Sequence, residues 1–135
     1  MQKVNHQRLM KAAVAARKKA VAPYSQFKVG AALLTSRGEI ITGANVESAS
    51  YGLTCCAERV ALFSALTSGK KDFVAIAVTA EMEGGAMPCG ACRQLLSEYA
   101  PKAAVLIADS RKPRTIRQFS VAELLPGAFT LETSV

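Results

Sequence analysis

Long apolar runs, internal repeats, linkers and low-complexity segments are all absent from this sequence. No apolar stretch approaches the roughly 20 residues that a membrane-spanning helix needs. Residues 1–7 are polar and lack the apolar core of a signal peptide. The sequence therefore predicts one domain over residues 1–135, soluble and cytoplasmic, with no membrane partner.

Acidic residues are missing from the first 38 positions, which hold eight Lys or Arg residues. The rest of the chain holds nine basic and ten acidic residues, so the net charge of +7 originates in the N-terminal segment. Such a segment could bind nucleic acid or anionic lipid. Aromatic side chains that would stack on bases are not interleaved with these charges, so we interpret the segment as a solvated helix face, with no nucleic-acid partner.

Histidine occurs once and cysteine four times. His6 lies far from the cysteines, and we interpret it as an exposed helix residue. Four cysteines could form disulfides in a secreted chain, but a C-x-x-C pair in an intracellular chain favours metal or redox chemistry. Cys55 and Cys56 are adjacent and are not expected to bridge each other or to share one ion, so we interpret Cys55 as a free, buried thiol.

The hydrophobic pattern predicts an α/β fold. We expect helices over residues 4–20, 56–68 and 90–99 and a short last helix opened by a capping box at Ser120. We expect strands over residues 27–35, 39–42, 73–80, 103–108 and 114–119, the last at a sheet edge, and a loop over 45–54. This order, α-β-β-α-β-α-β-β-α, implies parallel pairing across strand–helix–strand units. The prediction is a three-layer α/β/α sandwich with a mixed five-stranded sheet.

Two cysteine motifs carry the strongest functional signal. Cys56 is followed two residues later by Glu58, and Cys89 and Cys92 form a C-x-x-C pair directly after Pro88. Three thiolates can hold one zinc ion and leave its fourth position open, as in catalytic rather than structural sites. Both motifs are predicted to start helices, whose positive dipole ends favour thiolates.

Glu58 is the expected catalytic residue. A carboxylate beside a zinc-activated water can accept its proton and deliver it elsewhere. An acid in the first turn of a helix also commonly stabilises that helix, but the combination with Cys56 and the C-x-x-C pair favours catalysis. Arg59, Arg93 and Gln94 flank the ligands. We expect Arg59 and Arg93 to offset the thiolate charge and Gln94 to donate to a sulfur, the alternative being that all three are ordinary surface side chains.

With these motifs the chain resembles the small, homotetrameric cytidine deaminases that bind zinc through three cysteines. The resemblance extends over nearly the whole length, in residues 24–33, 43–49, 56–59, 88–94 and 124–129. It implies one Zn²⁺ per chain, bound by Cys56, Cys89 and Cys92. It also implies hydrolytic deamination of cytidine and 2′-deoxycytidine to uridine and 2′-deoxyuridine, with release of ammonia, in pyrimidine salvage.

The resemblance further implies how the nucleoside is bound. Glu58 would pass a proton from the activated water to N3 of cytosine and later protonate the departing amine. The segment Asn45-Val46-Glu47 would hold the ribose, since side chains two residues apart on an extended segment point the same way. The pyrimidine would contact the backbone of Ala57 and Cys89 and the ring of Phe27. Phe129 would reach it from a neighbouring subunit of a homotetramer.

Several alternatives stay open at this point. Without the resemblance, both phenylalanines would be interpreted as core aromatics. Blasticidin-type deaminases share the two cysteine motifs but lack the Asn-x-Glu segment in this form. A polynucleotide deaminase would use the basic N-terminal segment, although the chain is short for that role. A structural zinc module would need a fourth ligand, for which Cys55 is the spare thiol, and would leave Glu58 without a role.

Overall fold

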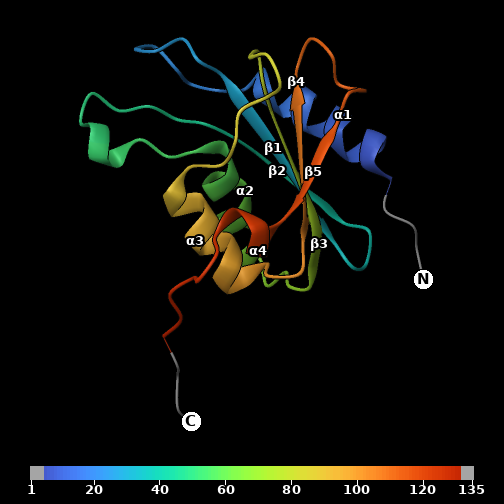
Figure 1. The fold of residues 1–135 in the computed structure, drawn as a ribbon. Coiled ribbons are helices and arrows are strands. Elements are labelled where there is room, and N and C mark those ends of the chain that lie inside the picture. Colours follow the sequence, from blue (N-terminus) through green and yellow to red (C-terminus); the bar gives the residue numbers. More distant parts are fainter. Residues whose placement is uncertain (1–4, 132–135) are drawn as a thin grey trace.

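The computed structural model of the chain describes residues 5–131, in which helices cover both faces of a five-stranded sheet (Figure 1). The elements in chain order are α1 (His6–Arg17), β1 (Val29–Thr35), β2 (Ile40–Ala44), the 3₁₀ helix η1 (Tyr51–Leu53), α2 (Ala57–Thr67), β3 (Phe73–Ala80), α3 (Gly90–Tyr99), β4 (Ala104–Asp109), β5 (Arg117–Ser120) and α4 (Val121–Leu124). None of the helices in this part of the chain is long and apolar enough to cross a membrane.

The strands lie in the order β2-β1-β3-β4-β5, which confirms the predicted mixed five-stranded sheet and the edge position of the last strand. β1 is antiparallel to β2 and β3, β3 is parallel to β4, and β4 is antiparallel to β5. Parallel pairing is less extensive than the strand–helix–strand pattern predicts. The reason is that β1 lies between β2 and β3, so the connection through α2 joins two strands that are not neighbours.

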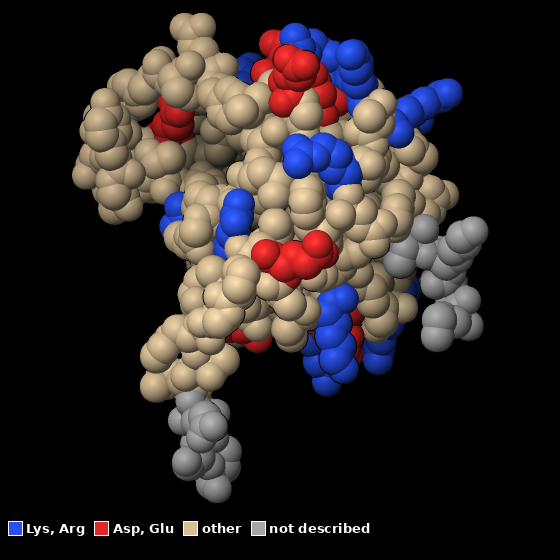
Figure 2. Space-filling view, in the orientation of Figure 1, with Lys and Arg blue, Asp and Glu red and all other residues tan. Residues whose placement is uncertain are grey.

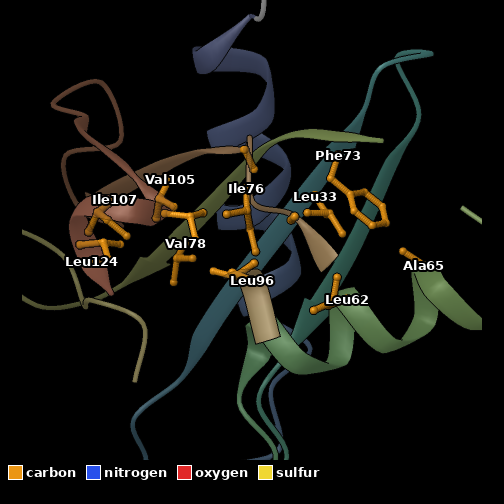
Figure 3. Packing of buried hydrophobic residues seen from close by; sticks show 13 residues of the cluster. Leu33, Leu62, Ala65, Phe73, Ile76, Val78, Leu96, Val105, Ile107 and Leu124 are labelled. Atoms are coloured by element: carbon orange, nitrogen blue, oxygen red, sulfur yellow. The ribbon is translucent and has the colours of Figure 1, made fainter. Parts of the chain in front are cut away.

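Successive residues of β3 point to opposite faces of the sheet and build two apolar layers. Ala75 and Ala77 pack under α1. Ile76 and Val78 pack under the other three helices. Figure 3 shows Leu62 and Leu96 at this second layer, contributed by α2 and α3. The predicted three-layer α/β/α arrangement is therefore confirmed, with α1 on one face and α2, α3 and α4 on the other.

Glycine allows the helices to approach the sheet closely. A Cβ atom on Gly43 of β2 would lie 2.5 Å from the nitrogen of Ala61 and 2.6 Å from the carbonyl oxygen of Ala57. A Cβ atom on Gly30 of β1 would lie 2.1 Å from a carbonyl oxygen of α1. Non-bonded heavy atoms do not come this close, so a side chain at either glycine would push the helix away from the sheet. Because Ala57 is the first residue of α2, Gly43 sets how near the beginning of that helix lies to the sheet.

Several predicted bounds differ from the structure. The helix predicted over 4–20 ends at Arg17. The backbone nitrogens of residues 18–20 then donate to carbonyl oxygens three positions earlier in the chain. Residue 4 lies outside the described range. The last two strands begin later than predicted, at Ala104 and Arg117. The predicted loop over 45–54 contains η1. The capping box at Ser120 is confirmed, since its Oγ accepts from the nitrogen of Glu123 while its own nitrogen donates to that carboxylate. His6 is partly buried at the first position of α1 rather than exposed.

Candidate metal centre and active site

Three cysteine thiols converge where two helices begin. Cys56 is the N-cap of α2, Cys89 is the N-cap of α3, and Cys92 lies in the first turn of α3. The sulfur of Cys89 lies 3.7 Å from that of Cys56 and 3.4 Å from that of Cys92, and all three lie within 4.8 Å of one another. Sulfurs bound tetrahedrally to zinc at about 2.3 Å are about 3.8 Å apart. The cluster therefore has the size of a three-thiolate zinc site.

The surroundings of the cluster favour a thiolate. A hydrogen bond from Cys92 lowers the pKa of Cys56 to about 5, against the opposing effect of burial, and Arg59 and Cys89 lower it further. The same hydrogen bond, together with burial, raises the pKa of Cys92. Cys56 therefore ionises before Cys92, and a bound cation would favour ionisation of the thiols that hold it. Such a set of soft sulfur ligands suits zinc.

Glu58 lies in the first turn of α2 beside these sulfurs. Its side chain is nearly buried, with 6% of the residue exposed. Burial raises the pKa of Glu58 from 4.5 to about 7, and the Cys56 charge adds to this, while a backbone hydrogen bond and the Cys92 thiol act in the opposite direction. A carboxyl group with a pKa near 7 can both accept and release a proton at neutral pH.

Arg59 contacts the cluster through its guanidinium group. Nη2 donates to Sγ of Cys56 at 3.5 Å and to the carbonyl oxygen of Thr54 at 3.2 Å. The hydrogen bond to Cys56 raises the pKa of Arg59, so the group stays charged. Its Nε atom is buried and has no hydrogen-bond partner among residues 5–131. A buried donor without an acceptor is costly, and further negative charge on the neighbouring sulfurs would offset that cost.

The segment from Asn45 to Glu47 is held in an extended conformation next to the cluster. Val46 forms backbone bridges with Val21 on one side and with Cys55 on the other. The nitrogen of Val46 donates to the oxygen of Cys55 at 3.0 Å, and the reciprocal bond measures 2.8 Å. Since Cys55 directly precedes the first thiol of the cluster, these bonds tie the candidate substrate segment to the candidate metal site.

Glu47 accepts hydrogen bonds from an N-terminal turn. The backbone nitrogens of Tyr24 and Ser25 donate to Oε1 at 3.0 Å and 3.1 Å, and the hydroxyl of Ser25 donates to Oε2. The Ser25 hydroxyl is the main cause of a lowered pKa of Glu47, so this carboxylate stays ionised. No role for Ser25 was predicted from the sequence. The only sequence feature that pointed to Ser25 was its position in segment 24–33, where the chain resembles the family. Its contact with Glu47, 22 positions away, forms only when the chain folds.

Asn45 supports the backbone that carries Phe27. Its Oδ1 accepts from the nitrogen of Val29 at 2.9 Å, and its Nδ2 donates to the carbonyl oxygen of Phe27 at 2.8 Å. One Nδ2 hydrogen and one Oδ1 lone pair remain for a ligand. The hydroxyl of Ser25 also accepts from the nitrogen of Phe27 at 3.0 Å. Phe27 itself is 39% exposed, so its interpretation as a core aromatic is wrong.

An open hollow of about 410 Å³ lies between the 24–25 turn and the loop that contains η1. It is lined by Tyr24, Ser25, Glu47, Ser48, Tyr51 and Thr54. Its volume falls in the range of about 300–1,000 Å³ typical of small-molecule sites. Tyr51 is 84% exposed, so the wall of the hollow at this residue is incomplete within one chain. The lobe formed by this loop, at the upper left of Figure 2, shows almost no Lys or Arg side chains on that face.

Phe129 follows α4 and is 67% exposed, so it too is not a core residue. Figure 1 shows the segment after α4 running away from the sheet. The amide of Gln94 donates to the carbonyl oxygen of Phe129 at 3.1 Å, and the guanidinium of Arg93 donates to the backbone of Pro88 and Leu124. The predictions that Gln94 donates to a sulfur and that Arg93 contacts the thiolates are therefore corrected, because both side chains extend from α3 to backbone oxygens instead.

The other predicted residues lie around the same cluster. Ala57 is fully buried at the start of α2, whereas Val46 and Cys89 are exposed. Cys55 is a free thiol, as predicted, but it is partly exposed rather than buried, because it lies in the connection between η1 and α2, outside the helices and strands that enclose the core. It is not among the three clustered thiols. Within residues 5–131, a structural zinc module thus lacks the fourth ligand that Cys55 was to provide.

Comparisons with known proteins agree with this geometry. A family profile described as the cytidine and deoxycytidylate deaminase zinc-binding region matches residues 3–108, which include the three clustered cysteines and Glu58. A cytidine deaminase from Halalkalibacterium halodurans is 51% identical over 129 residues, covering 96% of this chain and 97% of that protein. The crystal structure of a cytidine deaminase from Burkholderia pseudomallei has 51% identity and a TM-score of 0.89, covering 93% of this chain and 100% of that one. A blasticidin-S deaminase from Bacillus cereus is 35% identical over 114 residues, covering 78% of this chain and 79% of that protein.

Proposed function

The chain belongs to the cytidine and deoxycytidylate deaminase family, and on that premise we propose that it converts cytidine and 2′-deoxycytidine to uridine and 2′-deoxyuridine. In this hydrolysis the C4–N4 bond of cytosine is broken, water supplies the new oxygen at C4, and ammonia is released. The observation that carries the proposal is the placement of a nearly buried carboxyl group, Glu58, beside a cluster of three thiols.

The thiol cluster suits a Zn²⁺ ion in size and in donor chemistry. Cys56, Cys89 and Cys92 would hold one ion per chain. When bound, the ion supplies Lewis-acid activation of the attacking water. Arg59 and the starts of α2 and α3 stabilise the thiolates, which limits the excess negative charge at the site.

Glu58 moves the protons of the reaction. As a carboxylate it accepts a proton from the attacking water and delivers it to N3 of cytosine. It then carries a proton to N4 as the C4–N4 bond breaks. A pKa of about 7 supports this exchange of roles, since neither protonation state is strongly disfavoured at neutral pH.

Residues beside the thiol cluster bind the nucleoside in this proposal, and of these Glu47 also lines the hollow. Asn45, Val46 and Glu47 hold the ribose, and the backbone groups of Ala57 and Cys89 contact the pyrimidine. Glu47 is suited to this role because three donors hold its carboxylate in place and one acceptor position of Oε2 remains free for a hydroxyl. Phe27, partly exposed beside Asn45, supplies an apolar wall for the nucleoside.

We also propose a homotetramer in which Phe129 of one subunit completes the pocket of a neighbour. The exposure of Phe129, the direction of its segment away from its own domain and the open outer wall at Tyr51 support this arrangement. A cytoplasmic location and a role in pyrimidine salvage fit the substrate and the need to keep three thiols reduced.

Blasticidin S and a polynucleotide are the alternatives to a free nucleoside as substrate. The similarity to a blasticidin-S deaminase makes blasticidin S a specific alternative, but the braced Asn45–Glu47 segment favours a ribose. A polynucleotide would engage the basic helix α1. That helix packs on the opposite face of the sheet from α2 and α3, whose starts carry the thiol cluster, which favours a small substrate.

The test is the ultraviolet absorbance of cytidine mixed with purified protein of known zinc content, with Glu58→Gln as control. We expect loss of the cytidine band and release of one ammonia per cytidine, both absent from the control. Blasticidin S is assayed in parallel. Protein with one zinc per chain that turns over blasticidin S but not cytidine would overturn the proposed substrate and leave the metal site standing.

A further inference from the structure

Arg93 joins the cysteine loop to the C-terminal end of α4. Its Nε atom donates to the carbonyl oxygen of Pro88 at 2.8 Å, and its Nη1 atom donates to the carbonyl oxygen of Leu124 at 2.9 Å. Pro88 directly precedes Cys89, and Leu124 is the last residue of α4. One partly buried guanidinium group therefore holds together two segments that are 36 positions apart in the sequence.

Gln94, the next residue of α3, makes a second connection, to the segment that follows α4. Its Nε2 atom donates to the carbonyl oxygen of Phe129 at 3.1 Å. The chain between Leu124 and Phe129 turns at Gly127, whose φ is 63°. Phe129 and Leu131 are largely exposed, so their side chains gain little from packing within their own chain. The direction of this segment therefore depends on hydrogen bonds from α3 more than on burial.

We propose that Arg93 and Gln94 are positioning residues that set the place of Phe129 from the cysteine loop of the subunit that donates it. This inference rests on the proposed function, in which Phe129 lines the pocket of a neighbouring subunit. Its consequence is directional. A defect at Arg93 impairs the site of the neighbour, whereas the chain that carries the defect keeps its own cysteine cluster and Glu58.

Two substitutions remove these connections. Arg93→Met keeps the aliphatic stem but loses both hydrogen bonds, and Gln94→Ala loses the bond to Phe129. We expect the KM for cytidine to rise roughly tenfold in Arg93→Met, as for two lost hydrogen bonds. For Gln94→Ala we expect a rise of roughly threefold, as for one lost hydrogen bond. In both variants kcat stays within about twofold of the parent value, and zinc remains at one per chain.

Matched controls are available on β5. Arg117 also donates from its guanidinium group to a carbonyl oxygen, that of Gly84 at 3.1 Å, and Gln118 is an exposed glutamine. Arg117→Met and Gln118→Ala are therefore expected to leave KM unchanged. Arg93→Lys, which can reach one of the two carbonyl oxygens, should recover part of the loss.

Mixed oligomers supply the decisive measurement. Differently tagged Arg93→Met and Glu58→Gln chains are co-expressed, and oligomers that carry both tags are isolated. The Glu58→Gln chain has no working site but donates a correctly placed Phe129, so it should restore the site of an Arg93→Met neighbour. At equal mixing and a cytidine concentration well below KM, about a quarter of the parent activity per chain should appear, from sites with the parent KM. The same experiment with Phe129→Ala in place of Arg93→Met is the reference, and Gln94→Ala replaces Arg93→Met if that variant does not assemble.

The outcomes separate the inference from the function on which it rests. Restoration with both Phe129→Ala and Arg93→Met supports the inference. Restoration with Phe129→Ala alone would overturn the positioning role and leave the cross-subunit role of Phe129 intact. If Phe129→Ala impairs the homogeneous enzyme but is not restored by mixing, Phe129 serves its own subunit, and both the cross-subunit role and this inference are lost.

Discussion

Replacing Glu58 by glutamine separates proton transfer from folding. Glutamine keeps the size of the side chain and most of its hydrogen-bonding capacity but cannot carry a proton between water, N3 and N4. The metal-ligand group found in residues 5–131 contains only cysteines, and His6 lies on α1, across the sheet from α2 and α3. This group thus contains no carboxyl group or histidine that could carry the proton in place of Glu58. We therefore expect kcat to fall about 10⁴-fold or more, which corresponds to about 5.5 kcal/mol in the activation barrier.

The same substitution should stabilise the folded, metal-free protein at alkaline pH. The pKa of Glu58 is about 7 in the folded chain against 4.5 for an unperturbed carboxyl group. The folded state thus binds this proton more tightly than the unfolded state, so stability is fully present below pH 4.5 and is lost as the pH rises to 7. The two pKa values differ by an amount equivalent to about 3 kcal/mol. Glu58→Gln should exceed the parent protein by up to about 3 kcal/mol at pH 8 and equal it at pH 4.

The assay compares both proteins at each pH. Cys56, whose lowered pKa of about 5 makes stability rise with pH, is present in both, so most of its effect cancels in the difference. Urea unfolding of reduced, metal-free protein at one fixed concentration is followed by circular dichroism, since the chain has no tryptophan to report by fluorescence. Near-parent turnover by Glu58→Gln would contradict the role of Glu58 in proton transfer, and a lower stability than the parent at pH 8 would contradict the raised pKa of Glu58.

Three further substitutions test other parts of the site and fold. Cys55→Ser should retain one zinc per chain by metal analysis, whereas Cys89→Ser should lose it; the reverse result would favour a closed structural site. Ser25→Ala releases the carboxylate that lines the hollow, so the KM for cytidine should rise roughly tenfold with little change in kcat, and Ser25→Thr should restore it; an unchanged KM in Ser25→Ala contradicts this role. Gly43→Ala forces a methyl group against α2 and should lower the free energy of unfolding by about 2 kcal/mol. Gly52→Ala, whose methyl group meets open space, should leave it unchanged. Equal unfolding curves for the two variants would show that β2 and α2 can separate.

The sequence predicted those parts of the fold that depend on local pattern. β3 and α3 were expected with their observed bounds, and the capping box at Ser120 is present as predicted. The pairing of strands depends instead on contacts distant in the sequence. The alternation of strands and helices implied more parallel pairing than exists, because nothing in the local pattern shows that β1 lies between β2 and β3.

The candidate site divides in the same way. The spacing of Cys56, Glu58 and the C-x-x-C pair was sufficient to indicate zinc chemistry, since zinc ligands come from a few residue types at characteristic spacings. Side-chain partners were not predictable to the same degree. Gln94 was expected at a sulfur but donates to Phe129, and the role of Ser25 was missed, because the direction of a long side chain depends on which backbone lies beside it after folding.

The order of residues in this chain was thus sufficient to predict most of its helices and strands, a candidate ligand set and a candidate catalytic carboxyl group, since these predictions follow from periodicity and from the chemistry of individual side chains. Folding was needed to bring the three thiols within 4.8 Å of one another, to bury Glu58 so that its pKa rises to about 7, and to leave Phe129 exposed. Distance, desolvation and exposure are properties of segments brought together in space, and no short window of the sequence contains them.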